Sequence, residues 1–172
     1  RHCIATIAAA LNVGASAVIG VAAATGPAAP ARAGAERLVL VVGDSLSAEY
    51  GLPRGTGWVA LLEQKLAREK VPLRVVNASI SGDTTAGGRT RFATALNQFK
   101  PTIVVLALGA NDGLRGLPVK QLKENLVAMA RVSKGARARV LLVGMRLPPN
   151  YGAAYTEAFD RTFATVAKQE KL

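Results

Sequence analysis

The sequence of 172 residues has little cysteine and little histidine, and each shortage excludes a kind of site. Its one cysteine, Cys3, and its one histidine, His2, both lie within the first three residues. A single cysteine cannot form an intramolecular disulfide, and no thiol nucleophile is available after Cys3. Beyond His2 the chain also lacks the side chain that most often serves as a general base near neutral pH.

Acidic residues are scarce as well, with 11 Asp and Glu against 22 Lys and Arg and a formal net charge of +11. The basic residues are scattered, and no block of five or six is interleaved with aromatic residues. We therefore expect no nucleic-acid partner. Weak contact with an anionic membrane surface is a more modest use of the same charge. Half of the residues are hydrophobic, which suits a packed core in one domain.

The first third of the chain has the pattern of a targeting segment. Residues 3–31 carry no charged side chain, and small residues form candidate cleavage sites near Ala33 or Ala35. This is typical of a secretory signal peptide, residues 1–33, followed by a domain of residues 34–172 in the periplasm or outside the cell. The alternative is an uncleaved membrane anchor, because the run is long enough to span a bilayer. Cleavage would remove two arginines and lower the formal charge to +9.

From Arg37 onward, strand-like and helix-like segments alternate. Continuous apolar runs predict buried strands at 37–43, 73–76, 102–108 and 140–145. Apolar residues at helical spacing predict helices at 58–69, 90–99, 119–133 and 155–168. This order predicts a parallel sheet in a three-layer α/β/α sandwich of the flavodoxin-like type. Ligands of such sheets bind outside the carboxyl ends of the strands, so the loops there form the candidate site.

Three of these loops carry residues suited to acyl transfer. Ser45 follows the first strand, where its hydroxyl would face the cleft beside backbone N–H groups that favour a developing oxyanion. In the second loop, Gly82 can bring another backbone N–H close to a ligand because it has no side chain. In the third loop, the Asn111 amide can donate one more hydrogen bond. A nucleophile with three donors predicts an acyl-transfer site.

Three stretches of sequence resemble the first three blocks of the SGNH/GDSL hydrolase family: 43-GDSLS-47, 77-NASISGDT-84 and 109-GANDGLRG-116. Together with 146-RLPPNYG-152, they are similar to its periplasmic thioesterase, arylesterase and lysophospholipase subgroup. The resemblance implies that Ser45 is the nucleophile and that the Ser45 N–H, Gly82 and Asn111 form the oxyanion hole. It implies hydrolysis of aryl esters, acyl thioesters or lysophospholipids, with no metal or organic cofactor. We expect a monomer acting on a small acyl ester or thioester.

The fourth block of the family, an Asp and a His three residues apart, has no counterpart in this sequence. A serine without a base is a poor nucleophile at neutral pH. We expect a truncated form that lacks about one strand and one helix of the family fold. A natural degenerate member, or a base supplied by another residue, are the alternatives.

Two other functions are compatible with the same loops. Asp44, Asp83 and Asp112 each follow a strand, and three carboxylates at one sheet edge could hold Mg²⁺ for phosphoryl chemistry. A catalytically inactive remnant could instead bind acyl groups or lipids without turnover. A metal-dependent enzyme should be sensitive to chelators, whereas a serine enzyme should react with organophosphonates.

The candidate residues also have purely structural interpretations. Ser45 could cap the helix after the first strand, and Gly82 and Asn111 could be ordinary turn residues. Apolar residues beside the proposed cleft could line an acyl-binding groove. The candidates follow the third and fourth strands: Leu114, Leu117, Leu147 and Pro148.

Overall fold

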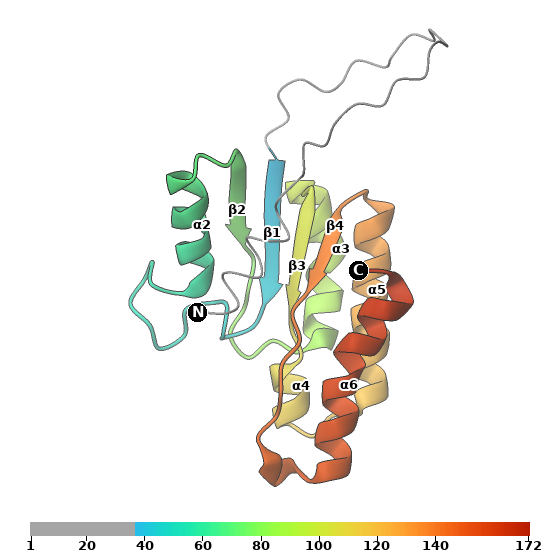
Figure 1. Ribbon diagram of the computed structural model, residues 1–172. Helices are drawn as coiled ribbons and strands as arrows, with labels where there is room; N and C mark the ends of the chain where they lie inside the picture. Colours follow the sequence, from blue (N-terminus) through green and yellow to red (C-terminus); the bar gives the residue numbers. More distant parts are fainter. Residues whose placement is uncertain (1–36) are drawn as a thin grey trace, which may run out of the picture.

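The four apolar runs form the strands of one parallel sheet, as the sequence predicts. The computed structural model describes residues 37–172 (Figure 1). The strands are β1 (Arg37–Gly43), β2 (Leu73–Asn77), β3 (Ile103–Ala107) and β4 (Arg139–Leu142). They lie in the order β2-β1-β3-β4, and every pair is parallel. All their carboxyl ends therefore point to the same edge of the sheet.

The expected signal peptide, residues 1–33, and its cleavage sites lie outside the described residues. The same holds for the alternative of a membrane anchor, so both remain predictions. Between residues 37 and 172, no helix combines the length and the apolar character needed to cross a membrane.

Helices cover both faces of the sheet (Figure 1). One face packs against α2 (Trp58–Arg68). The other packs against three longer helices: α3 (Thr85–Phe99), α5 (Val119–Gly135) and α6 (Ala153–Glu170). Two short elements follow strands: α4 (Ala110–Leu114) and the 3-10 helix η1 (Pro149–Tyr151). The three-layer α/β/α arrangement is confirmed.

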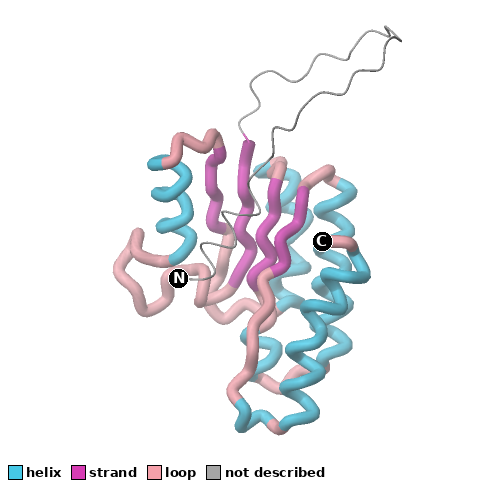
Figure 2. Tube along the Cα trace, in the orientation of Figure 1, coloured by secondary structure: helices cyan, strands magenta, loops and turns pink. Residues whose placement is uncertain are grey.

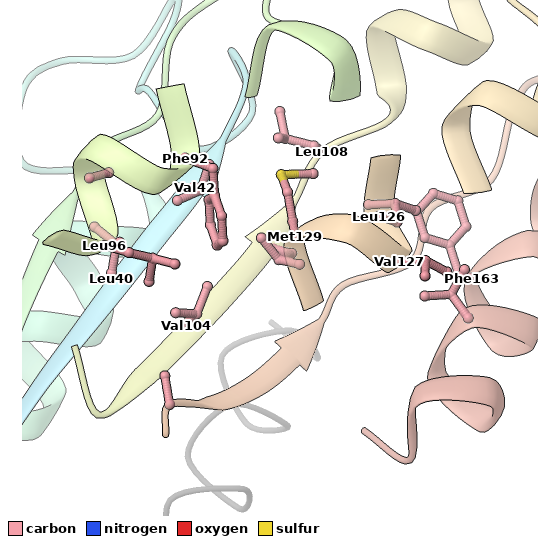
Figure 3. Close-up of a cluster of buried hydrophobic side chains, with 14 of the residues drawn as sticks. Leu40, Val42, Phe92, Leu96, Val104, Leu108, Leu126, Val127, Met129 and Phe163 are labelled. Carbon is pink, nitrogen blue, oxygen red and sulfur yellow. The ribbon is translucent and has the colours of Figure 1, made fainter. Parts of the chain in front are cut away.

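The burial of β1 on both faces explains why its sequence is continuously apolar. Successive side chains of a strand point to opposite faces. Leu40 and Val42 enter the larger core under α3, α5 and α6 (Figure 3), whereas Val39 and Val41 enter the smaller core under α2. All four side chains are fully buried, so alternation with polar residues is impossible here.

Several elements differ from the sequence-based expectations: β4 ends at Leu142 rather than at residue 145, α6 begins at Ala153 rather than at residue 155, η1 was not expected, and α3 and α4 differ most. The helix expected from residue 90 begins at Thr85, because the Thr84 hydroxyl caps it by accepting a hydrogen bond from the Gly87 N–H at 3.3 Å. The glycines of its first turn interrupt the apolar periodicity and hide this start. The short helix α4 was not expected, since five residues are too few for a periodic pattern.

Candidate active site

The loops that follow β1, β2 and β3 meet at the carboxyl edge of the sheet (Figure 2, loops in pink). The first two loops are joined directly. The Ile80 N–H donates to the Gly43 carbonyl at 3.0 Å, and Asn77 Nδ2 donates to the Ser47 carbonyl at 2.7 Å. Ser45 lies between the two residues of the first loop that are held in this way. Its backbone is therefore fixed relative to the second loop.

The second and third loops are joined in the same manner. Asn111 Nδ2 donates to the Asp83 carbonyl at 2.8 Å, and Arg115 Nη2 donates to the Gly82 carbonyl at 3.0 Å. These contacts bring together the three loops that carry Ser45, Gly82 and Asn111. The sequence predicted that the loops would share one edge, and the hydrogen bonds between them show how that edge is ordered.

Ser45 does not cap the helix that follows it, so that structural interpretation is wrong. The N-cap of α2 is Gly57, twelve residues later. Ser45 instead lies in a turn, closed by a 2.9 Å hydrogen bond from the Ala48 N–H to the Asp44 carbonyl. The Ser45 side chain is half-buried, and no residue between 37 and 172 hydrogen-bonds to its hydroxyl. The hydroxyl is therefore not engaged by those residues.

Gly82 has a backbone conformation that favours glycine. Its φ of +80° lies in the left-handed region, where a Cβ would be strained. The residue is exposed, so its backbone can approach a ligand without a side chain in between. The hydrogen bond from Arg115 to the Gly82 carbonyl holds the following peptide group in place. The positive φ and the exposure of Gly82 suit a residue that presents its backbone N–H to a ligand.

The Asn111 side chain is half-buried in α4. Its Nδ2 atom carries two hydrogens, and the bond to the Asp83 carbonyl uses one of them. The second hydrogen remains for another acceptor, and the first bond fixes the direction of the amide. A donor oriented before the substrate arrives is what stabilisation of an oxyanion requires.

Asp44 is a fully buried acid beside the candidate nucleophile. Its Oδ1 accepts a 3.0 Å hydrogen bond from the Leu46 N–H, but its Oδ2 finds no donor among the described residues. Burial is the main cause that raises the pKa of Asp44 above its ordinary value of 3.8. The negative charges of Asp83 and Asp112 add to this effect. Keeping this carboxylate ionised at neutral pH therefore opposes folding.

We expect Asp44→Asn to stabilise the fold at pH 7, by on the order of 1 kcal/mol. The raised pKa of Asp44 means that the folded state binds this proton more tightly than the unfolded state. The free energy of unfolding therefore falls as the pH rises from about 4 through the folded pKa. The gain from Asp44→Asn should shrink as the pH falls below about 4, because both states are then protonated. Urea unfolding of both proteins across this pH range measures it.

Asp83→Asn is the matched control, because the Asp83 carboxylate is paired with Arg91 at 2.8 Å. This variant should be destabilised at pH 7. A loss of stability in Asp44→Asn, or equal changes in the two variants, would contradict the account of Asp44.

The carboxylate contacts contradict the Mg²⁺ alternative. Asp83 is occupied by the Arg91 guanidinium, with Nε 2.8 Å from Oδ2. Both oxygens of the buried Asp112 accept hydrogen bonds from Thr85, at 2.8 Å from the N–H and 2.5 Å from the hydroxyl. Within residues 37–172, no group of three or more His, Cys, Asp or Glu is arranged to hold a metal ion. Asp83 and Asp112 are therefore engaged by groups of the protein and order the loops.

The four apolar residues predicted to line an acyl groove lie in different environments. Leu114 is 49% exposed at the end of α4, and Pro148 is also exposed. Leu117 is half-buried. Leu147 is half-buried too, and it packs directly against Gly113 and the core. Leu114 is therefore the most accessible of the three leucines, whereas Leu147 contributes to packing.

Sequence reasoning missed Glu49, which organises the loop between Ser45 and α2. Its carboxylate accepts hydrogen bonds from the Gly55 N–H at 3.0 and 3.1 Å and from the Gly57 N–H at 2.8 Å. Hydrogen bonding by these two N–H groups is the largest cause that lowers the pKa of Glu49. At the end of the loop, Trp58 Nε1 donates to Ser47 Oγ at 3.2 Å. No periodic pattern marks such an acid, because its partners are backbone groups.

Comparison with known proteins identifies the family of the chain. The model of the GDSL-like lipase/acylhydrolase family matches residues 41–172. Esterase TesA of Pseudomonas aeruginosa is 55% identical over 137 residues, which are 80% of this chain and 68% of TesA. Thioesterase 1/protease 1/lysophospholipase L1 of Escherichia coli K12 is 43% identical over 138 residues, 80% of this chain and 65% of that protein. The chain thus spans about two thirds of the length of these relatives.

Solved structures show the same fold. The crystal structure of TesA matches with a TM-score of 0.77 at 55% identity, and the matched region covers 78% of this chain and 75% of the TesA chain. Esterase EstA of a Pseudoalteromonas species, in a structure inhibited by monoethylphosphonate, has a TM-score of 0.76 at 42% identity, with 78% and 74% covered. The chain belongs to the GDSL-like lipase/acylhydrolase family and is an SGNH-type carboxylic ester hydrolase.

Proposed function

We propose that the chain hydrolyses acyl esters and thioesters through an acyl-enzyme on Ser45. The convergence of Ser45, Gly82 and Asn111 at one edge, through loops tied by hydrogen bonds, carries this proposal. The substrate class follows the names of the relatives, which include an esterase, an arylesterase and a thioesterase/lysophospholipase. Aryl esters, acyl thioesters and lysophospholipids share one feature, an acyl carbonyl next to a leaving group.

In the proposed reaction, Ser45 Oγ forms a bond to the carbonyl carbon and its proton passes to a base. The carbonyl oxygen becomes an oxyanion, held by the Ser45 N–H, the Gly82 N–H and Asn111 Nδ2. The bond to the leaving group then breaks, and the departing alkoxide or thiolate takes the proton from the base and is released as an alcohol or thiol. Water repeats the same steps on the acyl-enzyme, which releases the carboxylic acid and restores the Ser45 hydroxyl.

A fluorophosphonate tests the nucleophile directly. Ser45 Oγ should displace fluoride from phosphorus and form a stable ester, so the peptide that contains Ser45 should gain the mass of the phosphonyl group. Ser47, two residues away, is nearly fully buried and accepts a hydrogen bond from Trp58, so it should stay unlabelled. An adduct on Ser47, or one spread over several serines, would count against Ser45.

We expect Leu114→Ala to change acyl-chain preference. The exposed Leu114 side chain follows Asn111 by one helical turn, so it can contact the chain of a substrate whose carbonyl lies at the Asn111 amide. For p-nitrophenyl octanoate we expect kcat/KM to fall roughly tenfold, since each buried methylene contributes about 0.8 kcal/mol. For the acetate it should change less than about twofold. Val132→Ala, at an equally exposed residue on α5, is the control, and equal losses on both esters would refute the assignment.

We further propose that the protein is exported and acts as a monomer in the periplasm or outside the cell. The uncharged run of residues 3–31 and the small residues near Ala33 support export. Expression in a Gram-negative host, followed by N-terminal sequencing of the periplasmic protein, should give a start near residue 34 or 36. An unprocessed chain that sediments with the membrane would favour an anchor instead.

A further inference from the structure

Large hydrophobic side chains are exposed mainly at one end of the molecule. Among residues 37–172, eight such side chains are exposed, and five of them lie in the segments that connect β1, β2 and β3 to the next long helix, four in loops and Leu114 at the end of α4. These five, which we call the apolar rim, are Leu46, Tyr50, Leu52, Ile80 and Leu114. Singly scattered apolar residues need no explanation, but a group at one sheet edge indicates an interaction surface.

The most exposed part of the apolar rim lies outside the proposed oxyanion hole. Tyr50 is 78% exposed and Leu52 is 53% exposed, both in the loop that leads to α2. This loop is closed on itself, because the Glu49 carboxylate accepts hydrogen bonds from the Gly55 and Gly57 N–H groups. The loop therefore presents Tyr50 and Leu52 to water in a defined conformation.

The charges in these three loops are sorted by sign. Arg54 and Arg115 are both exposed. Every acid of the same loops is either buried or bound by donors of the protein: Asp44, Glu49, Asp83 and Asp112. The three loops therefore expose apolar side chains and positive charge, whereas their carboxylates are buried or paired.

We propose that the apolar rim docks on the surface of an anionic lipid bilayer. Apolar side chains at such a surface enter the boundary between headgroups and acyl chains, and arginines attract anionic headgroups. A second copy of the chain fits less well, because a two-fold contact through this edge would bring together two surfaces that both carry exposed arginines and no exposed unpaired acid in these loops. Docking in this orientation turns the loop of Ser45 toward the lipid.

A fluorophore in the Tyr50–Leu52 loop tests the docked surface in the full-length chain. Cys3→Ser removes the one native thiol, and Leu52→Cys then carries an environment-sensitive NBD label. On vesicles of phosphatidylcholine and phosphatidylglycerol, we expect its emission to increase and shift to the blue. The matched control is a label at Val132→Cys, which is 48% exposed on α5. An unshifted label at Leu52→Cys, or an equal shift at Val132→Cys, would overturn the proposal.

Binding by variants tests the two contributions separately. Arg54→Gln should weaken binding to the anionic vesicles roughly fivefold and leave binding to pure phosphatidylcholine unchanged, since one arginine near an anionic surface contributes about 1 kcal/mol. Arg68→Gln, at an exposed arginine near the end of α2, is the control and should bind like the parent. Tyr50→Ser combined with Leu52→Ser should weaken binding at least about tenfold. Equal binding by either test variant and the parent would overturn the proposal.

Two further outcomes separate this inference from its rivals. The parent could self-associate without lipid, and Tyr50→Ser combined with Leu52→Ser could abolish that association. This result would identify a second copy as the partner and overturn lipid docking. Ser45→Ala should bind the vesicles as the parent does, because docking does not use the Ser45 hydroxyl. A failure of Ser45 in catalysis would therefore leave the binding result intact, and a failure of binding would leave the catalytic assignment intact.

Discussion

Ser45→Ala is expected to abolish the Ser45-dependent hydrolysis of p-nitrophenyl butyrate, with a loss in kcat of about 10⁴-fold or more where a base accepts the Ser45 proton. Without the hydroxyl no acyl-enzyme can form, and only the residual effect of the oxyanion donors remains. Initial rates at saturating ester, corrected for spontaneous hydrolysis, measure this loss. Ser47→Ala is the neighbouring control, and we expect its kcat to fall less than about tenfold. Equal turnover by the parent and Ser45→Ala would show that Ser45 is not the nucleophile.

The size of this effect depends on the base that accepts the Ser45 proton. The one histidine of the sequence, His2, lies outside the described residues. Added imidazole can serve as a diffusible base. A rate increase with imidazole in the parent but not in Ser45→Ala would show a reactive hydroxyl that works with an external base. If the parent already hydrolyses the ester and imidazole raises its rate no more than it raises the rate of Ser45→Ala, the protein supplies its own base.

Asn111→Ala is expected to lower kcat by about 10² to 10³-fold while KM changes only a few-fold. The second Nδ2 hydrogen of Asn111 would bond to the oxyanion, which carries full charge only near the transition state. The effect should therefore appear in kcat, as steady-state kinetics with p-nitrophenyl butyrate can measure. Asn111→Asp keeps the shape of the side chain but removes the donor, so it should be impaired at least as strongly.

Loss of the 2.8 Å bond to the Asp83 carbonyl gives a structural alternative for the same result. That bond contributes about 1 kcal/mol to stability, so the thermal midpoint of Asn111→Ala should fall by only a few degrees. A large loss of stability, or a rise in KM without a fall in kcat, would assign Asn111 to the structure of the loop rather than to the oxyanion.

The arrangement of strands and helices was predictable from local pattern. The apolar run of β1 and the apolar stripe of α5 each report which sides of the element are buried. The order of the elements then determines a parallel sheet, and the parallel sheet puts every candidate loop at one edge. Ser45, Gly82 and Asn111 could therefore be selected before their contacts were known, although their catalytic roles remain predictions.

Only the tertiary structure decided which partners the polar groups have. Asp112 binds Thr85, 27 residues away, which removes it from any metal site. Asp44 is buried without a donor for Oδ2 among the described residues, and Leu147 packs against Gly113.

The physical reason is the distance along the chain between the residues that interact. Apolar periodicity and turn residues report the local environment of a segment, and local environment suffices to define helices, strands and their order. A hydrogen bond between side chains from different loops depends on positions that only the packed sheet brings within about 3 Å of each other. The sequence alone determined the fold class and the edge that holds the candidate site. The packing of the three loops decided which donors and acids meet there, and which apolar side chains remain exposed.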